Sequence, residues 1–253
     1  MRAPSFFVAH GAPSLALEQD DFTRAARTFG ESLRDVRAIA LVSAHWQARG
    51  VRVNAVARPE PIYDFGGFAP ELYRMRYDAP GDPELAREIA ALLDAPLETQ
   101  RGWDHGVWVP FLHLLPEART PIVEIALPGQ ADLMAIGRKL APLRERGIAI
   151  AGSGGIVHNL RILDFGNKNA QPLDWAAQFD GWIAERLAAR DFDAVAHYET
   201  APGAELAVPT PEHFEPLLIV LGAAHADDRV QTIYEGFQYA TLSMRSCVLK
   251  PNS

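Results

Sequence analysis

The run AIALVS, residues Ala38–Ser43, is apolar up to its last position and is followed directly by Ala44-His45-Trp46. A half-exposed strand alternates apolar and polar residues, whereas this run is continuous, so it predicts a strand covered on both faces. Such strands are typical of sheets that carry helices on each side. The run therefore indicates an α/β fold.

Short β-rich runs and amphipathic helical patterns alternate along the rest of the chain. The other strands are expected at Phe6–Ala9, Val51–Val56, Ile122–Leu127, Ile148–Ala151 and Tyr239–Leu249. Helices are expected at Asp21–Leu33, from the Asp82-Pro83-Glu84 cap through Leu93, at Ala131–Arg146, at Leu173–Ala189, and from the Thr210-Pro211 cap through Gly222. This alternation predicts an α/β sandwich with a central, mainly parallel or mixed sheet flanked by helices. No repeat or linker divides the chain, so we expect residues 1–253 to form a single catalytic domain.

The composition is that of an ordinary globular protein with an acidic balance. Hydrophobic residues make up 48% of the 253 positions, and 24 Lys and Arg against 32 Asp and Glu give a net charge of −8. Proteins that bind the phosphate backbone carry basic patches. Because no basic run occurs here, a nucleic-acid partner is disfavoured.

Cysteine content and hydropathy indicate the setting in which the protein works. Cys247 is the only cysteine, so neither an internal disulfide nor a Cys-x-x-Cys zinc or redox pair can form. The N-terminal apolar run is too short for a signal peptide. The longest apolar stretch, Leu217–Ala224, is far shorter than the ~18–20 residues that span a bilayer. We expect a cytoplasmic protein without a membrane partner.

Three histidines follow predicted strands from separate parts of the chain. His10 follows Phe6–Ala9, His45 follows Ala38–Ser43, and His158 comes shortly after Ile148–Ala151. Ligands bind at the carboxyl ends of strands in open α/β sheets. A single histidine is usually a surface or core residue, but three at strand ends are harder to explain by packing. Neutral imidazole is a common metal ligand, so they indicate an open divalent-metal site.

Two further histidines have less decisive surroundings. His213 falls in the first turn of the helix expected after Thr210-Pro211, where it either fills that turn or points to a site, with Glu212 as an alternative ligand. His105 is expected in a loop between Trp103 and Trp108, where packing explains it equally well.

The glycine-rich segment Gly152–Gly155 resembles a phosphate cradle but lacks the Lys-Ser/Thr pair and the dinucleotide spacing. We expect it to allow close backbone approach beside His158. Ser153 is not in a Gly-x-Ser-x-Gly elbow, which disfavours a serine hydrolase.

Taken together, the motifs resemble those of the class III extradiol ring-cleavage dioxygenases, nearest the 4,5-DOPA extradiol dioxygenase branch. The resemblance covers nearly the whole chain, because six motifs follow in the same order. They are His10-Gly11-Ala12-Pro13-Ser14, Ser43-Ala44-His45-Trp46, Tyr63-Asp64-Phe65-Gly66-Gly67-Phe68, Asp104-His105-Gly106-Val107-Trp108, Gly155-Ile156-Val157-His158-Asn159-Leu160 and Pro209-Thr210-Pro211-Glu212-His213.

The resemblance implies a non-haem metal site with His10, His45 and His213 as ligands. It implies that His158 is the acid–base residue, able to approach the metal as a fourth ligand, and that His105 contacts substrate or oxygen. An all-histidine set departs from the usual two-His-one-carboxylate iron triad. Fe(II) is expected for activity, because zinc has no redox chemistry, but Zn(II) suits the same ligands and is expected in purified samples.

The implied activity is the insertion of O₂ into a DOPA-like catechol, with ring opening beside the two hydroxyls. The expected partners are then a small-molecule catechol and O₂. The protein is expected to be a monomer or a small homo-oligomer. Phe65 and Phe68 are expected to stack on the substrate ring, although a turn with buried aromatics explains them equally well. A zinc-dependent hydrolase and a non-enzymatic metal-binding protein remain as alternatives.

Overall fold

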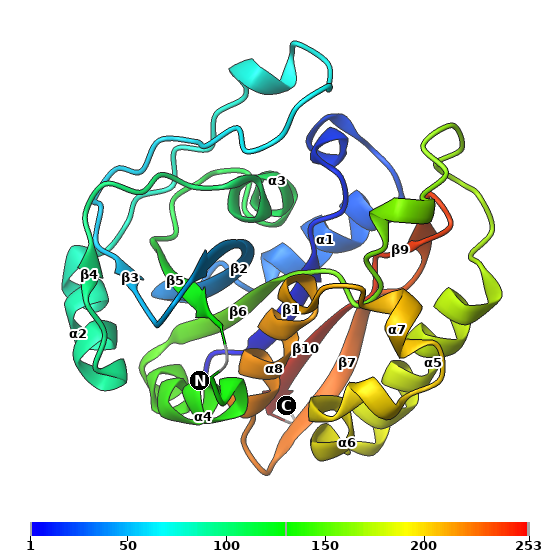
Figure 1. Ribbon diagram of the computed structural model, residues 1–253. Coiled ribbons are helices and arrows are strands. Elements are labelled where there is room, and N and C mark those ends of the chain that lie inside the picture. The colour runs from blue at the N-terminus through cyan, green and yellow to red at the C-terminus, as the bar shows by residue number, and fades with distance from the viewer. Residues whose placement is uncertain (1, 130, 252–253) are drawn as a thin grey trace.

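The fold is built on a mixed eight-stranded sheet with the order β4-β3-β5-β2-β6-β1-β10-β7 (Figure 1). The computed structural model describes residues 2–129 and 131–251. The sheet consists of β1 (Ser5–Ala9), β2 (Ala38–Ala48), β3 (Val53–Asn54), β4 (Leu97–Glu98), β5 (Ile122–Pro128), β6 (Ile148–Gly154), β7 (Asp228–Tyr234) and β10 (Ser246–Pro251). A separate small hairpin pairs β8 (Phe237–Gln238) with β9 (Leu242–Ser243).

The centre of the sheet is parallel and its outer strands are largely antiparallel. Strands β5, β2, β6 and β1 run parallel to one another, whereas β10 pairs antiparallel with β1 and with β7, and β3 pairs antiparallel with β5. Every residue of β1, β5 and β6 is buried, as is Ala38–Ala44 of β2. The expected α/β fold with a mixed sheet is confirmed, and the AIALVS run is covered on both faces.

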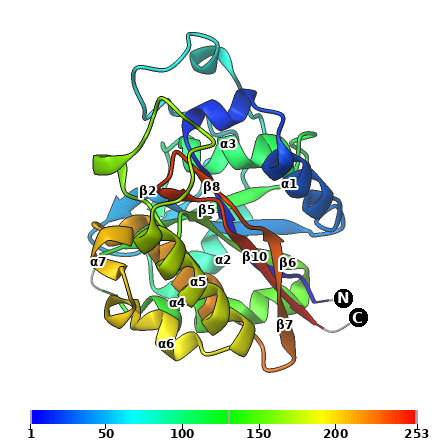
Figure 2. The same ribbon diagram turned by 90° about the vertical axis from the view of Figure 1, so that its right-hand side faces the viewer.

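Helices cover both faces of this sheet (Figure 2). One face packs against α1 and α3, and the opposite face packs against α2, α4, α5 and α8, giving two hydrophobic cores separated by the sheet. The helices are α1 (Asp21–Glu31), α2 (Pro83–Leu93), α3 (His105–Leu114), α4 (Leu133–Leu140), α5 (Asp174–Ala189), α6 (Phe192–Ala196), α7 (Ala204–Ala207) and α8 (Glu215–Gly222). In the described part of the chain, no helix combines the length and apolarity needed to cross a membrane.

Several expected elements are shorter or divided. The expected helix Ala131–Arg146 is α-helical only over α4 and continues as a 3₁₀ helix through Arg146, with a proline, which lacks an amide donor, in its first turn. The expected helix after Thr210-Pro211 starts as a 3₁₀ turn, Pro211–His213, before α8 begins. The expected strand Tyr239–Leu249 is broken because Tyr239 and Ala240 have φ angles of 54° and 65°, which a strand does not accept.

The helix α3 was not expected, and His105 is its first residue rather than a loop residue. Two features of its sequence explain why a helix is not predicted there. Nearly every side chain is buried, so the segment has no polar face and no amphipathic stripe. Pro110 also lies inside it, where proline normally argues against a helix.

A buried ion pair ties the two ends of the chain together. Arg144 has a fully buried side chain and donates hydrogen bonds to Asp228 Oδ2 at 2.6 Å, to the Ala3 carbonyl at 2.8 Å and to the Leu249 carbonyl at 3.1 Å. These partners belong to the start of β7, the segment before β1 and the strand β10. The guanidinium thereby joins the outer strands of the sheet to its centre.

We expect Asp228→Ala to lower the free energy of unfolding by about 3–5 kcal/mol, because it leaves the buried guanidinium of Arg144 without its counter-charge. Asp227→Ala is the matched control, since Asp227 is exposed and pairs only with Arg2 among the described residues. It should cost at most about 1 kcal/mol. Urea unfolding followed by circular dichroism measures both, and equal losses would contradict the importance of the buried pair.

Candidate metal centre

The histidines of two central strands meet at the carboxyl end of the sheet. His10 follows β1 directly, and its Nε2 lies 3.1 Å from Nε2 of His45 in β2. The strand β6 lies between β1 and β2 and ends in Gly154, so no bulky side chain from it separates the two rings. The edge at which the three parallel strands end is where ligands bind in open α/β sheets.

His45 lies within its strand, whereas the sequence placed it just beyond the strand end. The pairing of β2 with β5 passes from Val42↔Ile125 to Gln47↔Leu127, so residues 43–46 of β2 bulge opposite one residue of β5. Bulges of this kind redirect side chains and are frequent beside active sites. The bulge therefore presents His45 to the site without ending the strand.

Glycines at the end of β6 allow a third histidine to approach. A Cβ atom at Gly154 would lie 2.1 Å from the carbonyl oxygen of His213, and one at Gly152 would lie 2.6 Å from that of Pro216. The expected close backbone approach is thus present, but it brings in the segment around His213. His158 is only in ordinary contact, with its Cβ 3.6 Å from the Cβ position of Gly155.

All five candidate histidines are gathered in one cluster. The rings of His10 and His213 are 5.2 Å apart between centroids, and those of His45 and His105 are 3.9 Å apart. His158 stacks on His213 at 3.5 Å with the ring planes 7° apart. His113, by contrast, donates from Nε2 to the carbonyl of Leu15 away from this cluster, and His197 is exposed.

The Nδ1 atoms on the outside of the cluster have polar partners. His10 Nδ1 lies 3.1 Å from Ser153 Oγ, His213 Nδ1 lies 3.0 Å from a Glu212 carboxylate oxygen, and His105 Nδ1 lies 2.9 Å from Asp64 Oδ1. An Nδ1–H donated outward leaves the Nε2 lone pair facing inward, which is the arrangement of metal-bound histidines.

The inner nitrogens fit a metal ion. Nε2 of His213 is buried and has no hydrogen-bond partner among the described residues. His10, His45 and His105 each offer a ligand atom, and these atoms lie within 4.8 Å of one another. Imidazole nitrogens that face one another at such distances are a donor set that binds divalent transition metals.

Burial keeps these imidazoles neutral. Desolvation, with repulsion from neighbouring histidines, lowers the pKa of His10 well below its ordinary value. The same causes lower the pKa of His45 to about 3 and that of His158 to about 2. Burial also lowers the pKa of His213, although the neighbouring Glu212 acts in the opposite direction. Neutral imidazole is the form that coordinates a metal.

The outer carboxylates are ionised although they are partly buried. Burial alone would raise the pKa of Asp64, but the hydrogen bonds that it accepts from His105 lower it to about 2. Glu212 behaves in the same way, and hydrogen bonds from His213 and Thr210 lower its pKa to about 2. Thr210 precedes the 3₁₀ turn but does not cap it, because its hydroxyl donates to Glu212.

A buried polar network behind His45 was not found from the sequence. Asp104 accepts hydrogen bonds from Ser43 Oγ and from Arg101, both at 2.7 Å. Arg101 also donates to the backbone carbonyl of His45 at 3.3 Å and stacks on Trp46. This network fixes the bulged segment of β2 to Asp104, the residue that precedes α3. Asp104 therefore stabilises the backbone of the bulge and does not orient the ring of His105.

Glu124 of β5 is the other buried acid of this network. Its carboxylate lies 3.5 Å from Arg101 Nε. The side chains of Glu124 and Asp104 are both fully buried. Desolvation and the charge of Asp104 raise the pKa of Glu124 well above its ordinary value. In the sequence, the signal of this network is a single acid within the otherwise apolar run Ile122–Leu127.

The loop that contains Phe65 and Phe68 lies beside the cluster, as expected. The ring of Phe65 meets that of His105 edge-on at 5.7 Å, and Phe68 lies 5.6 Å from Phe65. Tyr73 and Trp108 extend this group, at 5.2 and 6.0 Å from Phe65. These four side chains, Phe65, Phe68, Tyr73 and Trp108, form an aromatic wall beside the histidine cluster.

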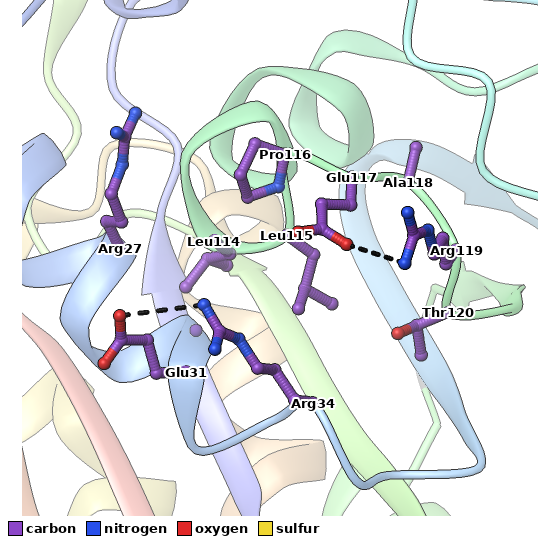
Figure 3. Close-up of a pocket in the computed structure, with 11 residues that line it drawn as sticks. Arg27, Glu31, Arg34, Leu114, Leu115, Pro116, Glu117, Ala118, Arg119 and Thr120 are labelled. Atoms are coloured by element: carbon purple, nitrogen blue, oxygen red, sulfur yellow. Dashed lines mark ion pairs between the residues drawn. The ribbon is translucent and has the colours of Figure 1, made fainter.

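A pocket with a volume of about 440 Å³ lies elsewhere, between α1 and the segment after α3 (Figure 3). Four of its charged side chains form the exposed ion pairs Glu31–Arg34 and Glu117–Arg119, and Arg27 is the fifth charged residue of the lining. None of the five clustered histidines lines it. Exposed pairs of this kind are screened by solvent and do not build a reactive site.

Residues 4–250 match the family described as the catalytic LigB subunit of aromatic ring-opening dioxygenase. The chain belongs to this family. Membership makes it an extradiol ring-cleaving dioxygenase, and so an oxidoreductase that uses a small-molecule substrate, O₂ and a metal cofactor. The class III resemblance is confirmed, and the hydrolase and non-enzymatic alternatives are not favoured.

Curated relatives of the LigB-family chain share its length. It is 37% identical over 256 residues to the 4,5-DOPA dioxygenase extradiol of Escherichia coli (strain K12), covering 97% of this chain and 94% of the relative. It is 36% identical to the Beta vulgaris protein of the same description, covering 96% and 94%. The crystal structure of an uncharacterized protein from Escherichia coli K12 matches with a TM-score of 0.84 and 32% identity, over 98% of this chain and 100% of that one.

We expect Gly106→Ala to weaken Zn(II) binding about tenfold or more, the scale on which disturbed ligand support acts. A Cβ at Gly106 would lie 2.4 Å from Ser43 Oγ, which must shift, and 3.1 Å from Cδ2 of His45, so that the ring is pushed by a few tenths of an ångström. Gly181→Ala in α5 is the control, because its Cβ meets no heavy atom within 4 Å. Competition with a chromophoric chelator measures the affinities, and equal affinities in Gly106→Ala and Gly181→Ala would contradict the expected disturbance of the His45 ring.

Proposed function

We propose that this dioxygenase opens the ring of a DOPA-like catechol beside its two hydroxyls. The observation that carries the proposal is the cluster of five histidines, whose inner nitrogens face one another beside an aromatic wall. The relatives described as 4,5-DOPA dioxygenase extradiol, at 36–37% identity over nearly the full chain, support a catechol of this type. A catechol offers two oxygens to a metal site and a flat ring to aromatic side chains.

His10, His45 and His213 are the proposed metal ligands. The buried Nε2 of His213, which has no hydrogen-bond partner among the described residues, supports its place in this set. The carboxylate of Glu212 already accepts hydrogen bonds from Thr210 and from His213 Nδ1, which favours His213 over Glu212 as the ligand. His105 lies within reach as well and is the competing third ligand.

Fe(II) is the proposed native metal, because bound iron supplies the redox chemistry toward O₂ that zinc lacks. Zn(II) competes for the same imidazoles and is expected in protein purified without added iron. The neutral state of His10, His45 and His213 suits either ion.

His158 is the proposed acid–base residue. An imidazole in this position can accept a phenolic proton from a bound catechol and return it to an oxygen of the opening ring. The stacking on His213 places it at the edge of the ligand set, from which it can also approach the metal as a fourth ligand.

His105 is the proposed second catalytic histidine, and Phe65 and Phe68 are the proposed substrate contacts. Because His105 Nδ1 is held by Asp64, its Nε2 is left to accept a hydrogen bond from substrate. Phe65 packs edge-on against this same ring, so an aromatic substrate that stacks on Phe65 lies within reach of His105.

We also propose that the chain works as a single catalytic domain in the cytoplasm, as a monomer or small homo-oligomer. The family match over residues 4–250 supports one domain. The burial of its only cysteine, Cys247, and the absence of a disulfide are compatible with a reducing compartment.

Oxygen uptake tests the reaction. Protein stripped of metal and reloaded anaerobically with Fe(II) should consume O₂ with L-DOPA or a related catechol and form a yellow ring-opened product. The zinc-loaded protein should consume none, because zinc is not redox-active. Iron-loaded protein that takes up no O₂ with any catechol of the panel would defeat the proposed reaction.

Alanine variants separate the roles of the histidines. His213→Ala should lose most of its bound metal, whereas His158→Ala should keep near-normal metal and lose about 10²–10⁴-fold in kcat, the usual contribution of a general acid–base group. His105→Ala is the comparison that decides the third ligand. Metal analysis after dialysis measures occupancy, and full metal in His213→Ala with loss in His105→Ala would transfer the ligand role to His105.

A further inference from the structure

One carboxylate, that of Asp64, lies against two histidines of the cluster at once. Its Oδ1 accepts hydrogen bonds from both the backbone N–H of His105, at 3.0 Å, and Nδ1–H of that ring, at 2.9 Å. Its Oδ2 lies 3.5 Å from Nδ1 of His45. The two rings come from different elements, α3 and the bulge of β2, and Asp64 comes from the loop that contains the aromatic wall.

The other nearby carboxylate cannot take this place. Asp104 directly precedes His105, but its two oxygens accept hydrogen bonds from Ser43 and Arg101. Adjacent side chains on a helix do not face each other, so a partner for the His105 ring has to come from a distant segment. Asp64, 41 residues earlier in the chain, supplies it.

A carboxylate that accepts a hydrogen bond from Nδ1 determines the tautomer of an imidazole. The proton is retained on Nδ1, and the Nε2 lone pair points to the opposite side of the ring. For His105 this side is the interior of the cluster, where its ring centroid lies 5.4 Å from that of His10. At His45 the contact is a charge 3.5 Å from Nδ1 rather than a hydrogen bond. A carboxylate at that side favours the proton on Nδ1, and Nε2 then faces Nε2 of His10 at 3.1 Å.

We propose that Asp64 is a positioning residue that holds His105 and His45 with their protons on Nδ1. His45 is thereby kept ready to bind the metal, and His105 is kept as a hydrogen-bond acceptor toward the substrate hydroxyl. Asp64 does not touch the reacting atoms. It acts through the two rings, and this inference rests on the roles proposed above for the histidine centre.

The same contact couples the aromatic wall to the centre. Phe65 follows Asp64 in the chain and packs edge-on against the His105 ring that Asp64 holds. The backbone beside it is anchored by hydrogen bonds from Trp108 Nε1 to the Ile62 carbonyl and from Tyr63 Oη to the Met75 carbonyl. Loss of the carboxylate therefore leaves the loop in place but frees the rings of the histidines.

The test uses Asp64→Ala and Asp64→Asn in the full chain. Long-range ¹H–¹⁵N spectra of the Zn(II)-loaded protein report which nitrogen of each imidazole carries the proton, and the His105 signal is identified by its loss in His105→Gln. In the wild type we expect His105 protonated on Nδ1. In Asp64→Ala we expect that proton to move to Nε2 or to divide between the two nitrogens, with Zn(II) affinity lowered about 10–100-fold.

Asp64→Asn separates the two contacts. Its single carbonyl oxygen can still accept from His105 Nδ1, whereas its amide group now faces Nδ1 of His45 as a donor. We expect the His105 tautomer to be retained and Zn(II) affinity to fall, which a merely structural role of Asp64 would not produce. Asp78→Asn is the matched control, because Asp78 is exposed, pairs with Arg76 and does not contact the histidines.

Retention of the Nδ1 proton on His105 in Asp64→Ala, together with Zn(II) affinity within twofold of the wild type, would overturn the proposal. Both readouts are independent of turnover. Absence of O₂ uptake by the iron-loaded wild type would therefore defeat the proposed reaction, while the tautomer and affinity measurements would still decide the role of Asp64.

Discussion

The close contact between the end of β6 and the backbone of His213 is the constraint on which the centre depends. Only glycine at position 154 leaves room for the His213 carbonyl, since any Cβ there would lie 2.1 Å from that oxygen. The amide of Gly155 then donates to the same carbonyl at 2.8 Å. His213 is thereby brought beside His10 and His45, which reach the site from β1 and β2. A larger residue at position 154 would push the third histidine away from the other two.

Around this contact, three of the five clustered histidines have an outer hydrogen-bond partner. Ser153 serves His10, Glu212 serves His213, and Asp64 serves His105. Water is largely excluded, so the imidazoles remain neutral, and the neighbouring carboxylates keep the charge that compensates a bound cation. Anionic groups thus lie outside the cluster and neutral imidazoles inside it, an arrangement that suits a divalent cation.

The scaffold positions these groups through buried polar contacts as well as hydrophobic packing. Behind the site, Arg101 and Asp104 fasten the bulge of β2 to the start of α3. At the far end of the sheet, Arg144 and Asp228 join the outer strands to the centre. Removing one member of such a pair leaves an uncompensated buried group, whereas the intact pair restricts the geometry of the elements that it joins.

The sequence by itself determined the α/β class and the central strands, because these follow from local patterns, and it singled out the strand-end histidines that the fold gathers. A continuous apolar run such as Ala38–Ser43 shows burial on both faces, and a histidine after such a run marks the carboxyl edge of a sheet. The tertiary structure alone decided that α3 is a helix, since a fully buried segment with an internal proline has no periodic signal. It also decided which carboxylate serves which ring, because Asp64 and His105 are 41 residues apart and only the folded chain brings their atoms within 2.9 Å.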